Sequence, residues 1–152
     1  MLKLLSGLYT PTEGHILLGG IDIQHISRHK VNSMIGYWPQ ATKLVSGTIR
    51  DNLTLGLVGV NDTQIMKAAN VTGLIGLINS APNGLDTVIP EGGNTLSGGQ
   101  KQLIAITRII LENPAIWLLD EPTANMDDFT EKHVINALNS QIAADKTLIL
   151  VT

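Results

Sequence analysis

The sequence predicts an α/β protein in which a parallel sheet carries an inserted α-helical segment. The run Ala115–Leu119 contains five apolar residues in a row, and such a run suits a strand that is covered on both faces in a parallel sheet. Further strand-like segments stand near both ends of the chain, and the stretch between them has mainly helical signals. The length of 152 residues and the hydrophobic content of 43% fit one folded domain.

Short elements separated by glycine and proline fill the first forty residues. The segment 1–9 has the pattern of the end of an amphipathic helix, which Ser6-Gly7 and Pro11 terminate. Residues 15–18 predict a short strand that enters a turn of two glycines. Ile35–Trp38 predicts a second strand, which Pro39 closes.

Helical signals dominate from Ser46 to Leu111. Asn61 and Ser97 are suitable N-caps, and the helix after Ser97 has an apolar stripe at Leu103, Ile106 and Ile110. We predict helices over residues 48–53, over residues 62–71, over residues 73–79 and after Ser97.

Two more elements follow the buried strand. Asp128 and Glu131 have the spacing of a capping box and predict a helix that runs to about Leu138. Lys146–Val151 contains a final apolar strand. We therefore expect residues 1–40 and 113–152 to form a sheet core, and residues 41–112 to form a helical subdomain.

Composition excludes several classes of function. Ten Lys and Arg against thirteen Asp and Glu give a net charge of −3, so we expect no nucleic-acid partner. The chain has no Cys and therefore no disulfide, thiolate metal site or cysteine nucleophile. No apolar run approaches the ~18 residues that span a bilayer, so we expect the isolated chain to be soluble.

Asp120 and Glu121 end the predicted buried strand. Open α/β sheets bind ligands at the carboxyl edge of their strands. Neighbouring residues of an extended chain point in different directions, so the two carboxylates can hold different roles. Asp120 suits Mg²⁺ coordination, and Glu121 suits polarisation of a water molecule that attacks a phosphate. The alternative is a solvated turn without function.

Leu96-Ser-Gly-Gly-Gln100 precedes a helix. Glycines at a helix start let backbone N–H groups approach an anion closely, and the helix dipole adds positive potential. Ser97 and Gln100 offer further hydrogen bonds to phosphate oxygens. The alternative is a flexible loop in which Ser97 is a plain N-cap.

The two motifs lie 21 positions apart, counted from Gln100 to Glu121, which leaves room for a helix, a turn and a strand. In this order they resemble the nucleotide-binding cassette of ATP-binding cassette (ABC) transporters. Leu96–Gln100 matches the family signature, and Ile116–Glu121 resembles the Walker B strand with its glutamate. Ala124–Asp127 resembles the D-loop, and Tyr37–Gln40 resembles the Q-loop.

The resemblance implies a partial P-loop NTPase-like parallel sheet with ATP and Mg²⁺ as cofactors. By this resemblance Glu121 is catalytic, and Asp120 and Gln40 contact Mg²⁺. The residues expected to contact nucleotide are Ser97, Gly98, Gly99, Gln100 and Asp127.

The family also implies partners and a location. A second nucleotide-binding domain is expected in a head-to-tail dimer, in which each nucleotide lies between two cassettes. A transmembrane domain of an exporter, fused or separate, is expected to hold the chain at the cytoplasmic face of the inner (plasma) membrane. There the family couples Mg·ATP binding and hydrolysis to transport.

Finer similarities point to exporters. Ser46–Leu53 and Val88–Gly93 resemble exporter cassettes, although Pro90 and Gly93 replace the usual Gly and Arg of the family's X-loop. Gly99–Arg108 and the D-loop are similar to ATPases of type I secretion. Arg108 is expected to face nucleotide or to pair with a carboxylate, and His133 is expected at the surface.

A P-loop requires Gly-x-x-x-x-Gly-Lys-[Ser/Thr], and none of the seven lysines follows a glycine. The resemblance places the missing Walker A loop before Met1 and the switch histidine directly after Thr152. We therefore expect a cassette that lacks both and has little ATPase activity alone, and a strand 116–119 that lacks some of its neighbours.

Two alternatives stay open at this point. In the first alternative, the chain is a non-catalytic partner-binding module or a gene remnant. In the second, it is a non-transport ABC ATPase that acts on DNA or ribosomes. The path from Gln40 to Ser97 covers 57 positions (97 − 40), which leaves no room for a long coiled coil of the DNA-repair type.

Overall fold

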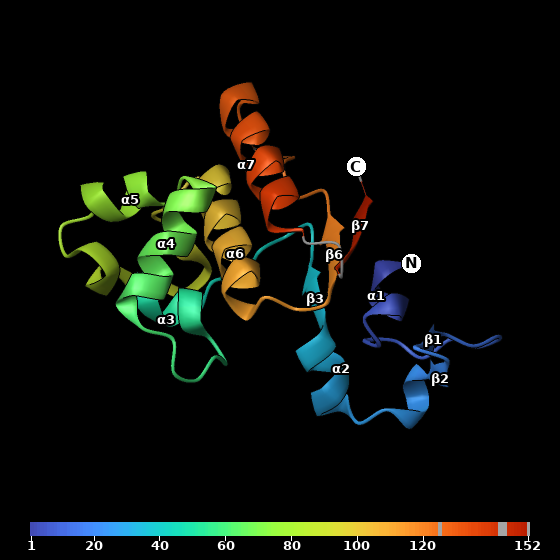
Figure 1. Ribbon diagram of the computed structural model, residues 1–152. Coiled ribbons are helices and arrows are strands. Elements are labelled where there is room, and N and C mark those ends of the chain that lie inside the picture. The colour runs from blue at the N-terminus through green and yellow to red at the C-terminus, as the bar shows by residue number, and fades with distance from the viewer. Residues whose placement is uncertain (125, 143–145, 152) are drawn as a thin grey trace.

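A computed structural model describes residues 1–124, 126–142 and 146–151. The chain has the predicted α/β fold. Three parallel strands stand in the middle of the molecule, with a group of helices, α3 to α6, on one side (Figure 1). The short elements α1, α2, β1 and β2 lie on the other side of the strands.

The central sheet has the strand order β3-β6-β7, from β3 (Ile35–Trp38), β6 (Ile116–Asp120) and β7 (Thr147–Val151). All pairs are parallel, with Trp38 opposite Leu119 and Asp120 opposite Val151. The three predicted strands are confirmed. The expectation that residues 116–119 lack neighbours is wrong, because β6 is hydrogen-bonded on both edges.

Successive side chains of β6 enter different apolar clusters, as the alternation of a strand requires. Leu119 packs with Trp38 and Trp117 in a cluster under α6 (Gly98–Glu112) and α7 (Asp128–Gln141). Leu118 packs in a second cluster that includes Leu2 of α1 (Leu2–Leu5) and Val31 of α2 (Arg28–Met34). Both faces of the strand are therefore covered.

A third apolar cluster holds the helical part of the chain together. It joins α3 (Ile49–Thr54), α4 (Asp62–Thr72), α5 (Ile75–Ser80) and the strand pair β4 (Gly47–Thr48) and β5 (Val88–Ile89). Ile104 of α6 belongs to this cluster, whereas Ile106 and Ile109 belong to the cluster on the sheet. Helix α6 therefore links the helical elements to the sheet.

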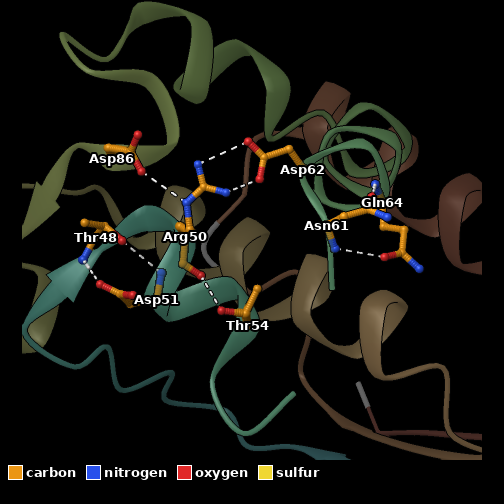
Figure 2. A network of polar contacts seen from close by, with 8 residues as sticks. All are labelled: Thr48, Arg50, Asp51, Thr54, Asn61, Asp62, Gln64 and Asp86. Carbon is orange, nitrogen blue, oxygen red and sulfur yellow. Dashed lines mark hydrogen bonds and ion pairs between the residues drawn. The ribbon is translucent and has the colours of Figure 1, made fainter. Parts of the chain in front are cut away.

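Polar side chains fix the starts of the helices in this part. Thr48 with Asp51 and Asn61 with Gln64 form capping boxes, which confirms the N-cap predicted at Asn61. Arg50 donates from Nε to Asp86 at 3.1 Å and pairs with Asp62 through its other nitrogens (Figure 2). Arg50 thus joins α3 to the first turn of α4 and to η2 (Gly84–Asp86).

The start of α7 differs from the prediction. Its N-cap is Asp127, not Asp128, so Glu131 lies one position beyond N3 and the expected capping box is absent. Glu131 instead accepts a hydrogen bond from the Thr123 hydroxyl at 2.8 Å. The sequence also gave no signal for helix α2. The remaining short elements are β1 (Leu17–Leu18), β2 (Ile21–Asp22), η1 (Ile23–His25) and η3 (Glu91–Gly93).

None of the helices within the described ranges combines the length and the apolar character that crossing a membrane requires.

A glycine in β3 gives a test of the sheet packing. A Cβ atom on the buried Gly36 would lie 2.6 Å from Cγ of Pro114, so Gly36→Ala forces β3 away from the turn before β6. We expect it to lower the free energy of unfolding by about 1–3 kcal/mol, as overpacking does. Urea denaturation of the purified chain measures this loss.

Gly76→Ala is the matched control, because a Cβ atom at this position in α5 meets no heavy atom within 4 Å. Alanine is the better helix former, so this variant should gain about 0.5–1 kcal/mol. Equal effects of the two substitutions would contradict the packing described for β3.

Candidate functional site

The register of the sheet brings Gln40 and Glu121 together. Trp38 is opposite Leu119 at the end of the β3-β6 ladder. Gln40 lies two residues beyond Trp38, and Glu121 lies two residues beyond Leu119. Nε2 of Gln40 donates a hydrogen bond of 2.7 Å to Oε2 of Glu121, across 81 positions of the sequence. These two predicted site residues, which come from different motifs, are therefore direct neighbours.

Glu121 turns the chain sharply out of β6. Its φ of 47° is in the left-handed region, which non-glycine residues rarely adopt outside constrained sites. Its N–H donates to the carbonyl oxygen of Val151 at 2.8 Å, so the end of β7 holds this turn. The backbone of Glu121 therefore follows a course different from that of Asp120, the last residue of the strand.

Asp120 is half-buried at the same edge. The pKa of Tyr37 lies above its ordinary value, first because the ring is partly buried and second because the negative charge of Asp120 is close. The Asp120 carboxylate is therefore near the Tyr37 side chain of β3.

The signature segment, Leu96–Gln100, begins α6. The Ser97 hydroxyl oxygen accepts from N–H of Gln100 at 3.2 Å, and Oε1 of Gln100 accepts from N–H of Ser97 at 2.9 Å. This capping box confirms Ser97 as the N-cap and uses the side-chain amide oxygen of Gln100. The N–H groups of Gly98 and Gly99 have no acceptor within the helix. With the Ser97 hydroxyl proton they form a set of donors suited to an anion.

Asp127 already has a structural role. Its carboxylate caps α7 by accepting from N–H of Phe129 and of Thr130 and from the Thr130 hydroxyl, at 2.7–3.1 Å. The hydrogen bonds from Thr130, followed by that from Phe129, lower the pKa of Asp127 below its ordinary value. Two residues of the expected motifs, Asn125 of the D-loop and Thr152, lie outside the described residues.

The loop after Gln40 meets the start of α6. Gln40, Ala41 and Thr42 on one side and Gly98, Lys101 and Gln102 on the other line a cavity of about 370 Å³. Gln102 is only 2% exposed, and neither atom of its amide has a hydrogen-bond partner within the described part of the chain. Neither Gln102 nor Thr42 was predicted from the sequence. The signal available was a polar residue inside the buried stripe of an otherwise apolar helix.

Arg108 lies further along α6. Its Nε donates to the main-chain carbonyl oxygen of Asn52 at 2.8 Å, which ties α6 to α3. Among the described residues no carboxylate lies within 4.0 Å of its nitrogens, so the expected ion pair is not formed, although the charge of Glu112 acts on Arg108 at longer range. Arg108 also lines a cavity of about 390 Å³ with Tyr37, Pro39 and Lys43. His133 is exposed, as expected.

The oxygen atoms at the sheet edge fit a magnesium ion. Mg²⁺ prefers hard oxygen ligands and takes one or two protein carboxylates, with water and phosphate oxygens completing its coordination. Asp120 offers a carboxylate there. Gln40 uses its Nε2 for Glu121, which leaves its carbonyl oxygen for a cation. Within the described residues no group of three or more His, Cys, Asp or Glu forms a complete protein metal site.

A helix start with free backbone donors and a parallel-sheet edge that ends in carboxylates are features of nucleotide-binding α/β domains. The family model described as ABC transporter matches residues 1–124, which is most of the chain. The chain therefore belongs to the ABC transporter family.

Similar proteins are transporters. The lactococcin-G-processing and transport ATP-binding protein of Lactococcus lactis subsp. lactis is 41% identical over 99% of this chain, which corresponds to 21% of that protein. The ABC-type transporter fsqE of Aspergillus fumigatus is also 41% identical over 99% of the chain, corresponding to 12% of its length. The chain thus spans about a fifth or less of these two relatives.

A solved structure has the same fold. The structure of a bacterial Atm1-family ABC exporter with ATP bound is 35% identical and superposes with a TM-score of 0.91. The match covers 97% of this chain and 26% of the exporter chain. At this similarity the fold and the cassette family are shared.

The cap of α7 predicts a dependence on pH. The folded-state pKa of Asp127 is below its ordinary value of 3.8, so the cap contributes stability that is complete above that value. The contribution is lost as pH falls through the lower, folded-state pKa. We expect the Asp127→Asn variant to keep an N-cap but to lack the stability that the ionised carboxylate contributes to the unmodified chain. The difference in unfolding free energy between the two proteins should shrink from pH 5 toward pH 2, measured by urea titration.

Asp128→Asn is the control, because Asp128 is a helical residue and not the cap. A pH dependence that changes equally in both variants would contradict the assignment of Asp127 as the N-cap.

Proposed function

We propose that the chain is the main part of an ATP-binding cassette of an ABC-type exporter, which couples Mg·ATP binding and hydrolysis to transport across the membrane. The observation that carries this proposal is the hydrogen bond of 2.7 Å between Gln40 and Glu121 at the end of β6. It joins the Q-loop to the Walker B glutamate, and the signature segment is near because Gly98 lines the cavity that Gln40 enters.

In this proposal each polar group at the sheet edge has one task. Asp120 and the side-chain carbonyl oxygen of Gln40 would hold Mg²⁺, which would neutralise charge on the nucleotide phosphates. Glu121 accepts a hydrogen bond from the attacking water and then its proton. The amide of Gln40 holds the Glu121 carboxylate in place for this step.

The signature segment serves a second nucleotide. The donors of Ser97, Gly98 and Gly99 lie at an exposed helix start. A helix start of this kind suits the phosphate of a nucleotide that is bound to the partner cassette. Gln100 contributes by fixing Ser97 through the capping box. The head-to-tail dimer of cassettes places the two sites against each other. Asp127 supports that interface from the start of α7.

The helical subdomain faces the membrane domain in this proposal. We assign residues 41–112 to this subdomain and residues 1–40 and 113–152 to the sheet core. The cavity of about 390 Å³ between the Q-loop and α6 is the docking place for a segment of the membrane domain. Nε1 of Trp38 and Nη2 of Arg108 are buried there without partners in the described structure, and a docked segment would satisfy them.

The relatives support a membrane-bound exporter. Three of them carry names of lactococcin transport proteins, which is why we place this cassette with ATPases of type I secretion and at the cytoplasmic face of the inner membrane. The fused or separate membrane domain would select the transported substrate.

A first prediction concerns association with an intact cassette. Mixed with the isolated ATP-binding cassette of the Lactococcus lactis relative, this chain should associate at least ten-fold more tightly with Mg·ATP than without it. Gly98→Asp should abolish this gain, because the added carboxylate repels the nucleotide phosphate and blocks its access to the helix start. Sedimentation velocity measures the association.

Asn79→Asp makes the same change of charge at an exposed position on α5, outside the signature segment, and should leave the association unchanged. Aspartate at the first turn of α6 is favourable to the helix, so Gly98→Asp should fold. Association that is equally tight with and without Mg·ATP would favour a non-catalytic partner-binding module over an ATP-binding cassette.

A second prediction concerns turnover by the chain alone. No lysine follows a glycine in the sequence, so the lysine and backbone cradle that stabilise the transferred phosphoryl group are missing from it. We expect phosphate release at the background rate. Vanadate-sensitive hydrolysis that Glu121→Gln abolishes would refute this expectation.

A further inference from the structure

The short turn η3 connects the loop after Gln40 to the start of the signature segment. Gly92 donates from its N–H to the carbonyl oxygen of Leu44 at 3.1 Å, and the carbonyl oxygen of Gly93 accepts from N–H of Leu96 at 2.9 Å. Leu44 lies four residues beyond Gln40, and Leu96 is the first residue of the signature segment. Two adjacent residues of η3 are therefore hydrogen-bonded to the loop and to the signature segment.

Position 93 has room for glycine only. Gly93 is buried and has a φ of 63°, in the left-handed region that favours glycine. A Cβ atom there would lie 2.8 Å from Cδ1 of Leu44 and 3.3 Å from Cε of Lys101, which belongs to the first turns of α6. Leu44 is 3% exposed and packs in the apolar cluster of the helical elements, so its side chain is not free to turn away. The absence of a side chain on Gly93 is therefore what allows this close approach.

The same loop is held on its other side as well. Val45 follows Leu44, and its N–H and carbonyl oxygen are both bonded to the side-chain amide of the fully buried Asn52, each at 3.0 Å. The main-chain carbonyl oxygen of Asn52 accepts from Nε of Arg108 at 2.8 Å. Helix α6 is therefore connected to this loop twice, at its start through η3 and further along through Asn52. A displacement of α6 is carried to the loop by both connections.

We propose that Gly93 is a positioning residue, which lets η3 hold the loop after Gln40 against the signature segment so that the two move together. The consequence for catalysis rests on the function proposed above. Gln40 donates to Glu121 at 2.7 Å, so a movement of the signature segment on a partner's nucleotide is passed through Leu44 and Gln40 to the Glu121 carboxylate. Gly93 acts through these residues and does not itself contact nucleotide.

Two neighbouring glycines give a matched test. Gly93→Ala places a methyl group against Leu44, whereas the methyl group of Gly92→Ala meets no atom nearer than Oδ1 of Asn94, at 3.7 Å. Both backbones are left-handed, with φ of 63° and 73°, so alanine should raise the unfolding equilibrium constant about ten-fold at either position. Gly93→Ala should raise it by a further factor of about ten, because it also overpacks the contact with Leu44. Urea denaturation of the chain measures both constants.

The side-chain amide signals of Gln40 separate positioning from stability alone. In a ¹H–¹⁵N spectrum of the chain they are identified by their loss in Gln40→Ala, and Glu121→Ala gives their position when the acceptor is missing. Gly93→Ala should move them toward that position, because it displaces Leu44 and the loop. Gly92→Ala should leave them in place. Unmoved signals in Gly93→Ala, or equal movement in both variants, would overturn the proposal.

A shorter side chain at position 44 should rescue the defect. Leu44→Val removes the Cδ1 atom that a methyl group on residue 93 would meet. In the Leu44→Val background, Gly93→Ala should therefore cost no more stability than Gly92→Ala, and the Gln40 signals should stay where they are in Leu44→Val alone. Fully additive effects of the two substitutions would contradict the contact.

The double variant also decides the question if Gly93→Ala does not fold by itself. The proposal requires Leu44→Val with Gly93→Ala to fold, and its failure to fold would refute the steric link. None of these measurements uses nucleotide, so failure of the link is distinct from failure of the proposed ATPase function.

Discussion

Parallel pairing of β6 with β3 and β7 is the constraint on which the rest of the molecule depends. Because Leu118 and Leu119 of β6 are buried in separate clusters on the two faces of the sheet, the strand offers polar groups only where it ends. The same register fixes which residues of the neighbouring strands reach that end. Gln40 follows from β3 and Val151 from β7, and both contact Glu121.

Helix α6 extends this frame to the helical elements. Its first turn is fixed by the Ser97–Gln100 capping box, and its apolar residues enter two clusters, one with the helices and one with the sheet. Arg108 adds a hydrogen bond to the backbone of α3. A displacement of the helical elements therefore cannot leave α6 in place, and the donors at its start move with it.

The sequence predicted those parts of the fold whose causes are local. The apolar run of β6 and the N-caps at Asn61 and Ser97 follow from neighbouring residues alone. Helix α2 was not predicted, since Val31 is its only buried residue and leaves no apolar stripe to detect. Asp127 and Asp128 are both suitable N-caps, and the sequence alone does not decide between them; in the structure the Asp127 carboxylate accepts from N–H of Phe129 and of Thr130.

The site was predictable to a different degree. The residue types of Glu121, Asp120 and the signature segment pointed to phosphate chemistry, whereas Gln40 was nominated only through the resemblance. Its contact with Glu121 joins positions 81 residues apart, which no periodicity or spacing reveals. Gln102 is less visible still, because a glutamine on a helix is ordinarily a surface residue. Gln102 is 2% exposed and lines a cavity with the loop 40–42, whose course the sequence does not specify.

The left-handed backbone of Glu121 shows what this arrangement costs and how it is maintained. A non-glycine residue at a φ of 47° costs on the order of 1–3 kcal/mol, and the following Pro122 narrows the backbone choices of Glu121 further. The hydrogen bond of its N–H to Val151 offsets part of this cost. The position of the Glu121 carboxylate therefore depends on where β7 ends as well as on Gln40. Any change that shifts the β6-β7 register by one residue would remove that carbonyl and release the turn.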